Sequence, residues 1–341
     1  MAVPLTTIVS DPDWIPHALD AGGGNLTFVR VPRDDRAALT FLSDEHYKGQ
    51  FPQEAFPLPP VAGTLDGIEQ APLHFIFHTS FCCSTLLAKA LEVPGRAMSL
   101  KEPEVLLHLA NRFARVEDEA ERKRLDITLR LLARPYAEGE TIIVKPSNFA
   151  NRLLAPALVR DQRTRAVLLY SDLPTLLRSL AKKAIWGRIF GRQLYRNLAA
   201  WSWLNLGYGP VETFDQTDLQ ITALAWLMHI HHFNEVARQS GPERVMLLNS
   251  ADFLDSVPET LGGVSRFLGV DLDQATIADI ARGPVFSAHS KLPGAYSAEE
   301  REREHAAVEA AHGEEIAMVL KWLAAVAAHA GVPIQPALLG A

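Results

Sequence analysis

Small polar side chains follow the first strongly apolar run of the chain, in a position that suits the binding of an anion. The run spans residues 73–78 and shows no helical period, whereas residues 85–91 have the composition of a helix. A strand, a loop and a helix in this order present backbone N–H groups and the positive end of a helix dipole. The loop between them carries Thr79, Ser80, Phe81, Cys82, Cys83 and Ser84. We therefore expect a phosphate or sulfate group to bind there.

Three ionisable side chains could act on a substrate held at this loop. Glu102 precedes a helical stretch that begins near Val105, and it is either a general base or an ordinary acid at a helix start. Lys145 ends an apolar run before Pro146, so it either stabilises developing negative charge or lies in solvent. His78 ends the first run, and its imidazole either assists a phosphate in its charged form or is neutral and hydrogen-bonded.

The elements that must position these residues alternate between short apolar runs and helical stretches. Besides the first run, the predicted strands are residues 141–145, 165–170 and 244–249. The predicted helices in the second half of the chain are residues 219–239, 258–268 and 298–328. Near-continuous apolar strands separated by helices predict an α/β fold with a parallel sheet of four or five strands. We expect an N-terminal elaboration at residues 1–70 and the α/β domain at residues 71–341.

Composition and charge narrow the class of protein. The 341 residues are 48% hydrophobic, and 33 Lys and Arg against 40 Asp and Glu give a formal charge of −7. This acidic balance disfavours a nucleic-acid surface, so any anion site must be local. The two cysteines are adjacent, and no uncharged stretch reaches the ~18 residues of a membrane span. We expect a cytoplasmic protein without a nucleic-acid or membrane partner.

Other chemistries fit this sequence less well. The loop lacks the two glycines and the lysine of the nucleotide-binding pattern G-x-x-x-x-G-K-[ST], on which magnesium-dependent phosphoryl transfer relies. A thiol phosphatase would need an arginine six residues after Cys83, where the chain has Lys89. His229 and His232 lie one helical turn apart, but the same stretch carries Trp226 and other apolar side chains, so packing is favoured over a metal site.

Residues 75–87 resemble the 5′-phosphosulfate loop of sulfotransferases, whose bacterial and tyrosyl-protein members read roughly P-[RK]-S-G-T-T-L-L. In this comparison Cys83 takes the place of the family's glycine, and Ser84 and Thr85 replace the hydroxyl pair that holds the 5′-phosphate. Phe81 falls where the family has Arg or Lys. The residues that the resemblance assigns to donor binding in the loop are Ser80, Phe81, Cys82, Cys83, Ser84 and Thr85.

The spacing of an acidic residue extends the resemblance. Glu102 stands 18 residues after Ser84, similar to the position at which tyrosyl-protein sulfotransferases have their catalytic glutamate. Residues 249–270 resemble the family's closing signature, a strand, an acidic turn and a proline-led helix that ends in Phe-Leu-Gly-Val. The likeness therefore covers about residues 73–270. It implies a P-loop-type parallel sheet with helices on both faces, with 3′-phosphoadenosine 5′-phosphosulfate (PAPS) as donor and no metal.

Two further segments are similar to nucleotide-binding parts of the family. Ser171 stands at a strand end where the family's 3′-phosphate motif has an arginine, and Ser179 matches the helical serine of that motif. Arg178, next to this serine, would replace the missing strand-end cation. A late polar loop with His289 and Lys291 lies where family members close over the nucleotide.

The resemblance implies transfer of a sulfuryl group from PAPS to a hydroxyl or amine of a small-molecule or peptide acceptor. In that reaction Glu102 would act as base, and Lys145 and His78 would be the catalytic groups beside it. Two alternatives stay open. Because Phe81 and Ser171 replace cations of the family, one is a protein of this fold that binds a nucleotide or phosphate without catalysis. The other is an ATP-using P-loop kinase. The sequence identifies neither the acceptor nor the oligomeric state.

Overall fold

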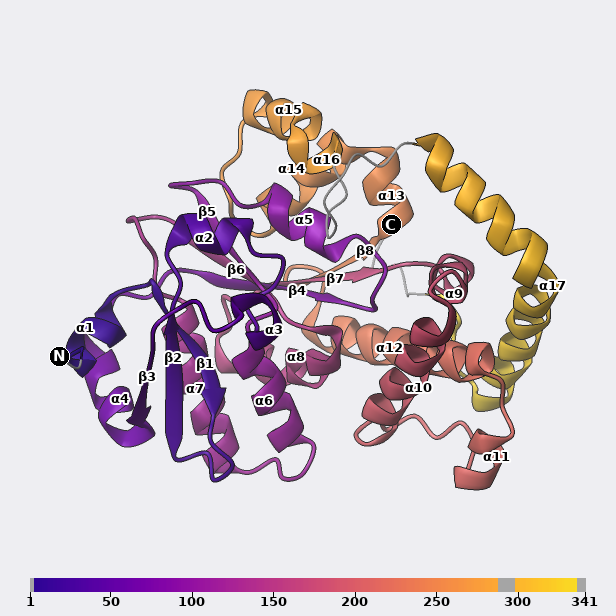
Figure 1. Cartoon of the computed structure of the whole chain (residues 1–341), viewed down its shortest axis with the longest axis horizontal. Helices are drawn as coiled ribbons and strands as arrows, with labels where there is room; N and C mark the ends of the chain where they lie inside the picture. The colour runs from indigo at the N-terminus through magenta and orange to yellow at the C-terminus, as the bar shows by residue number, and fades with distance from the viewer. Residues whose placement is uncertain (1–2, 288–297, 336–341) are drawn as a thin grey trace. The chain divides into compact units, whose positions relative to one another are not determined.

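A five-stranded parallel sheet carries the candidate residues (Figure 1). The computed structural model describes residues 3–287 and 298–335 of the chain. The strands lie in the order β5-β6-β4-β7-β8, with bounds β4 Leu73–His78, β5 Ala97–Lys101, β6 Thr141–Lys145, β7 Ala166–Tyr170 and β8 Val245–Asn249. Every residue of β4, β5 and β6 is buried, which explains why their sequences do not alternate between apolar and polar residues. The predicted α/β class with a parallel sheet is confirmed.

The first strand of this sheet, β4, lies at its centre between β6 and β7. Its first three residues pair in parallel register with residues 142–144 of β6. On the other side of β6, strand β5 pairs from Ala97 opposite Thr141 to Lys101 opposite Lys145. The chain fills one side of the sheet before it crosses to the other. The loop after β4 therefore leaves the sheet at its topological switch point, where open α/β sheets bind ligands.

Helices alternate with the strands along the chain. Their bounds are α1 Leu5–Ser10, α2 Arg33–Ala38, α3 Asp44–Tyr47, α4 Leu58–Thr64, α5 Ser84–Ala90, α6 Glu104–Phe113, α7 Glu119–Leu132, α8 Leu154–Arg160, α9 Leu173–Ala181, α10 Ala184–Ala199, α11 Pro210–Phe214, α12 Asp218–Ser240, α13 Ser250–Asp255, α14 Val257–Phe267, α15 Gln274–Arg282, α16 Pro284–Ser287 and α17 Ala298–Ala330, with 3-10 turns at Leu65–Gly67 and Asn148–Leu153. The helices predicted at the end of the chain correspond to α12, α14 and α17. Within the described ranges, each helix is too short or too polar to cross a lipid bilayer.

A second sheet precedes the first along the chain. It is antiparallel, in the order β1-β2-β3, with bounds β1 Trp14–Leu19, β2 Asn25–Arg30 and β3 Gln53–Pro57. Helices α6 and α7 pack against β1. The buried Arg134, which follows α7, donates hydrogen bonds to the carbonyl oxygens of Ile8, Val9 and Asp11 at 2.9–3.0 Å. This guanidinium satisfies the carbonyl groups at the end of α1, which would otherwise be buried without donors.

The described chain forms two compact units. The first consists of residues 3–77, 84–167 and 256–286, and the second of residues 78–83, 168–255, 287 and 298–335. Strands β4 and β7 begin in the first unit and end in the second. The boundary that the sequence suggested at residue 70 stays a prediction.

Candidate active site

The loop after β4 has a backbone conformation that L-amino acids rarely adopt. The φ angle is +85° at Ser80, +49° at Phe81 and +61° at Cys83. A left-handed conformation costs a non-glycine residue about 1–2 kcal/mol, whereas glycine adopts it freely. Strain of this kind persists where the surrounding structure fixes it, and such places are often ligand-binding turns. The loop thus has the backbone of a glycine-rich turn without its glycines.

Hydrogen bonds to the end of β7 fix this conformation within the second unit. The Thr79 N–H donates to the Leu169 carbonyl at 3.1 Å, and the Ser171 N–H donates to Thr79 Oγ1 at 3.4 Å. The buried Cys82 thiol donates to the same Leu169 carbonyl at 3.4 Å. Cys82 therefore anchors the loop, which is a structural role rather than that of a nucleophile.

The two ends of the loop's first turn are joined through His78. The Ser80 N–H donates to His78 Nδ1 at 3.2 Å, and the histidine is 4% exposed. A ring nitrogen that accepts a hydrogen bond carries no proton, so this imidazole is neutral and has its hydrogen on Nε2. Of the two forms that the sequence left open for His78, this geometry has the neutral, hydrogen-bonded one.

Phe81 belongs to an aromatic cluster of the second unit. Its ring meets the ring of Phe190 edge-on at 5.7 Å and that of Trp186 at 6.3 Å between centroids. Trp186 and Phe190 stack on each other at 5.2 Å, one helical turn apart on α10. Apolar packing on α10 thus occupies the side chain at the position where the resembled family has a cation.

Three buried hydroxyl groups at the predicted phosphate positions have no hydrogen-bond partner in the described part of the chain. They are those of Ser80, Thr85 and Ser171, in residues that are 5%, 1% and 0% exposed. Leaving a buried hydroxyl unpaired costs about 1–3 kcal/mol, and a bound phosphate oxygen would remove that cost. Ser84, the first residue of α5, is also buried. These side chains fit a phosphate-bearing ligand.

Glu102 and Lys145 form an ion pair in the first unit. Lys145 Nζ donates to Glu102 Oε1, and the Glu102 N–H donates to the Lys145 carbonyl at 2.6 Å. The Lys145 side chain is 0% exposed and that of Glu102 is 19% exposed. The solvated lysine that the sequence left open is therefore wrong.

The position of Glu102 depends on the parallel register of β5 and β6. Lys101 pairs with Lys145 as the last residue pair of the two strands, so Glu102 directly follows the paired segment. Its φ of +52° turns the chain away from β5 before α6 begins at Glu104. Glu102 Oε2 has no hydrogen-bond partner among the described residues. One carboxylate oxygen is thus held by an ammonium, and the other can accept a proton.

The remaining predicted residues are those of the 3′-phosphate motif and of the late polar loop. Arg178 donates to Glu309 of α17 at 3.1 Å in a partly exposed ion pair, and Ser179 follows it on α9, half-buried. Any phosphate that uses Arg178 must therefore compete with Glu309. His289 and Lys291 lie outside the described residues.

The sequence analysis did not single out Lys101, which also ends a strand of the site. It is 3% exposed, and its Nζ donates to the Ala37 carbonyl at 2.9 Å. Burial lowers its pKa to about 8, with a further lowering by the nearby Lys89. The only sequence signal was a lysine at the end of a five-residue run, whose Ser99 interrupts the apolar pattern.

One group of side chains in the described residues was considered as a metal site. The described residues bring together one group of His, Asp and Glu side chains close enough to share an ion, namely His17, Asp44 and Glu104. Hydrogen bonds explain this group without an ion: His17 Nε2 pairs with Asp44 Oδ1 at 2.9 Å, and Glu104 accepts from the Asp44 N–H at 2.6 Å. The histidines of α12 form no such group in the ranges described.

No protein-family model and no curated protein matches the chain. Among solved structures, it is similar to the sulfotransferase STF1 of Mycobacterium tuberculosis, with 12% identity, 79% of this chain and 80% of that chain covered, and a TM-score of 0.42. For the sulfotransferase domain of a Synechococcus olefin synthase these values are 14%, 69%, 84% and 0.41. For the mouse sulfotransferase SULT7A1 complexed with PAP they are 16%, 65%, 68% and 0.34. All three are described as sulfotransferases or sulfotransferase domains.

Proposed function

We propose that the chain transfers a sulfuryl group from PAPS to a hydroxyl or amine. The observation that carries the proposal is the loop after β4, where three non-glycine residues hold a left-handed backbone beside hydroxyl groups that lack partners. Successive backbone N–H groups in such a turn form a concavity for an anion. Ser80, Ser84 and Thr85 are the proposed ligands of the 5′-phosphate, and Ser171, Arg178 and Ser179 those of the 3′-phosphate.

Glu102 is the proposed general base. The acceptor oxygen or nitrogen attacks sulfur, its proton passes to Glu102 Oε2, and the bond between sulfur and the bridging oxygen breaks. The electron pair of that bond leaves with 3′-phosphoadenosine 5′-phosphate (PAP). Lys145 holds the other carboxylate oxygen, so the base keeps one orientation while the proton moves.

Binding and turnover test the proposal separately. Calorimetry with PAP should show binding that Thr85→Val weakens by about 10-fold, since the hydroxyl would bond a charged phosphate. Glu102→Gln should lower turnover by about 10²–10⁴-fold and leave PAP affinity within about 2-fold, because a base acts on the acceptor rather than on the nucleotide. Glu119→Gln, an exposed acid on α7, is the matched control. Absence of PAP binding to the unmodified chain would contradict the proposal.

Phe81 favours a second candidate function, the binding of a nucleotide without catalysis. Its ring packs on α10, so this position supplies no positive charge for the leaving oxygen. The same experiments separate the two functions. PAP binding without sulfuryl transfer to any of a panel of phenols, alcohols and amines would support the non-catalytic protein.

A further inference from the structure

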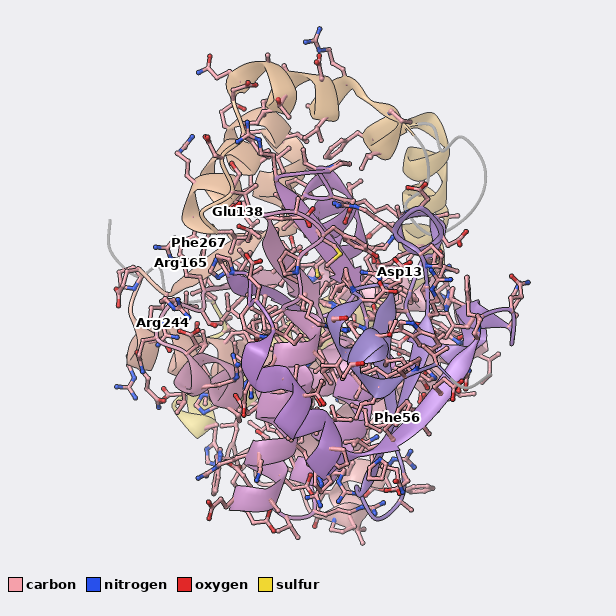
Figure 2. The ribbon with its side chains drawn as sticks, turned by 90° about the vertical axis from the view of Figure 1, so that its left-hand side faces the viewer. Asp13, Phe56, Glu138, Arg165, Arg244 and Phe267 are labelled. Carbon is pink, nitrogen blue, oxygen red and sulfur yellow. The ribbon has the colours of Figure 1, made fainter. Side chains whose placement is uncertain are left out.

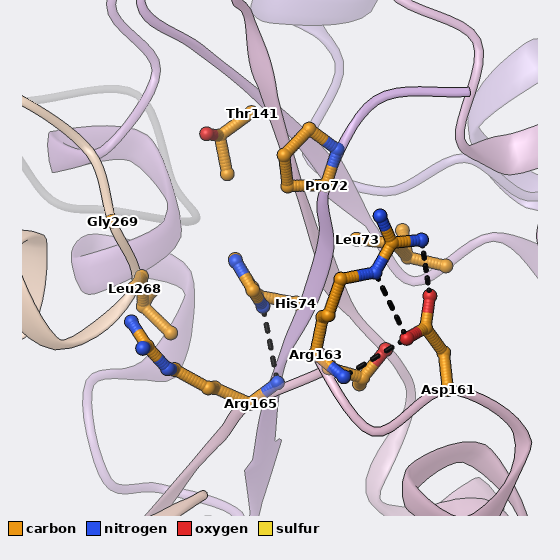
Figure 3. A pocket seen from close by; sticks show the side chains of 10 residues that line it. Pro72, Leu73, His74, Thr141, Asp161, Arg163, Arg165, Leu268 and Gly269 are labelled. Carbon is orange, nitrogen blue, oxygen red and sulfur yellow. Dashed lines mark hydrogen bonds and ion pairs between the residues drawn. The ribbon is translucent and has the colours of Figure 1, made fainter. Parts of the chain in front are cut away.

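A small cavity lies at the amino ends of the strands in the first unit. Its volume is about 210 Å³, and it is bordered by the starts of β4 and β6 and by the turn before β7 (Figure 3). Glu102 and Lys145 lie at the carboxyl ends of β5 and β6, so the cavity lies at the opposite ends of the strands from these two residues. Pockets for drug-sized ligands measure about 300–1,000 Å³, so this cavity suits a smaller guest.

His74 directs a hydrogen-bond donor into the cavity. The Arg165 N–H donates to His74 Nδ1 at 3.0 Å, which leaves the hydrogen of the neutral ring on Nε2. Burial and the neighbouring Arg165 lower the pKa of His74 to about 4, so the ring is neutral near pH 7. The residue is 5% exposed, and Figure 3 shows its free nitrogen pointing into the space toward Thr141. No described residue accepts a hydrogen bond from this nitrogen.

Arg165 supplies a positive charge at the same cavity. One guanidinium nitrogen donates to the Phe267 carbonyl at 2.6 Å, and the guanidinium carbon lies 5.9 Å from the centre of the Phe267 ring. Figure 2 shows the two side chains on the same face of the molecule. No carboxylate of the described chain forms an ion pair with Arg165. The cation is thus held in place by a carbonyl and a ring, and its charge is not neutralised.

The other polar groups of the cavity leave donors in excess. The carboxylate of Asp161 accepts two hydrogen bonds from the Arg163 guanidinium, at 3.0 and 3.2 Å, so these two charges compensate each other at the rim. Thr141 is 4% exposed, and its hydroxyl bonds to no described residue. A neutral imidazole N–H, a hydroxyl and a guanidinium without a carboxylate partner therefore line a space in which the one carboxylate, that of Asp161, is paired with Arg163.

We propose that this cavity binds a small oxyanion, a phosphate, sulfate or carboxylate group, through His74, Thr141 and Arg165. Each of these groups can donate to an oxygen, and the guanidinium adds the charge that distinguishes an anion from a neutral polar molecule. The oxyanion is either a free ion or the terminal group of a small metabolite, since the space beyond the donors is limited. The site is separate from the proposed donor site and does not depend on sulfuryl transfer.

Calorimetry of the full chain with inorganic phosphate, at an ionic strength kept constant with chloride, tests the site. We expect phosphate to bind this cavity with a Kd of about 1 mM. Thr141→Val, which exchanges the hydroxyl for a methyl group, and Arg165→Gln should each weaken this binding by about 10-fold. Arg122→Gln is the matched control and should change affinity by less than about 2-fold, because its exposed guanidinium pairs with Glu117 and does not line the cavity.

Phosphate could also bind at the loop after β4, so the titration is repeated with Thr85→Val. Binding that survives this substitution and weakens with Thr141→Val supports the proposal, whether or not Arg165→Gln folds. A titration with glycerol 3-phosphate identifies the source: binding as tight as that of phosphate indicates a terminal group, and weaker binding indicates the free ion. Absence of binding, or equal losses with Arg122→Gln and Thr141→Val, would overturn the proposal.

Discussion

Glycine at position 83 should give a more stable protein than alanine there, although glycine usually weakens a folded chain. The φ angle of +61° at Cys83 lies in the left-handed region, where a side chain is strained. Glycine removes that strain but also makes the unfolded chain more flexible, which favours unfolding. The sign of the change in unfolding free energy therefore reports which of the two effects is larger at this turn.

The expected magnitude follows from comparing glycine with alanine at position 83, because both substitutions remove the partly exposed thiol. Left-handed strain costs alanine about 1–2 kcal/mol. The added freedom of the unfolded glycine chain costs about 0.4–1 kcal/mol. The difference leaves Cys83→Gly more stable than Cys83→Ala by about 0.8 kcal/mol at the midpoints of these ranges, and by about 1.6 kcal/mol at most.

Urea unfolding followed by tryptophan fluorescence measures the two variants, with Cys82 as the matched position. Cys82 lies in the same loop but is not among the residues with positive φ. There glycine should be less stable than alanine by about 0.5–1 kcal/mol. A glycine penalty of that sign and size at position 83 as well would refute the interpretation of the loop as a strained anion turn.

Three further predictions concern the strand ends and α10. Lys145→Met should lower the unfolding free energy by about 3 kcal/mol in urea titrations, because it leaves the carboxylate of Glu102 without its ammonium partner. The double variant that also carries Glu102→Gln should recover at least half of that loss. Lys101→Met should raise the Tm at pH 7, because burial of the Lys101 ammonium lowers its pKa to about 8 and so disfavours the folded state. This gain in Tm should shrink between pH 8 and about 10.5, where the unfolded wild-type chain binds a proton that the folded chain has released. A gain that does not depend on pH would contradict the lowered pKa of Lys101. Gly187→Ala should lower the Tm, since the added Cβ would overlap the backbone carbonyl group of Leu180 in α9. Gly263→Ala, with open space around its Cβ, should raise the Tm by helix propensity.

The sequence predicted the central strands because burial on both faces leaves a readable run of apolar residues. The segments at 73–78 and 141–145 coincide with β4 and β6 in the structure. Strand β5 was not predicted, because Ser99 and Lys101 interrupt its apolar pattern. The Lys101 ammonium donates to the Ala37 carbonyl, whereas the buried Ser99 hydroxyl has no hydrogen-bond partner among the described residues. A partner as distant in sequence as Ala37 leaves no local signal.

The candidate residues were predicted one at a time, whereas their relations required the structure. Glu102 and Lys145 each stood out at the end of an apolar run, but their ion pair depends on β5 lying next to β6. The strained conformation of Ser80 was equally unreadable, because nothing in a serine codes for a positive φ. From the sequence, Phe81 indicated only the loss of a positive charge. The structure shows that its ring packs against Trp186 of α10.

Glu102 and Lys145 are joined by two interactions, so the proposed chemistry depends on the correct pairing of β5 with β6. The backbone bond and the ion pair both join the chain just after β5 to the last residue of β6, and two helices, α6 and α7, separate these strands in sequence. A slip of one residue would send alternate side chains to opposite faces and separate the carboxylate from its ammonium. During refolding, a proton acceptor at this place can appear only once that non-local register has formed, so recovered catalysis would time the event.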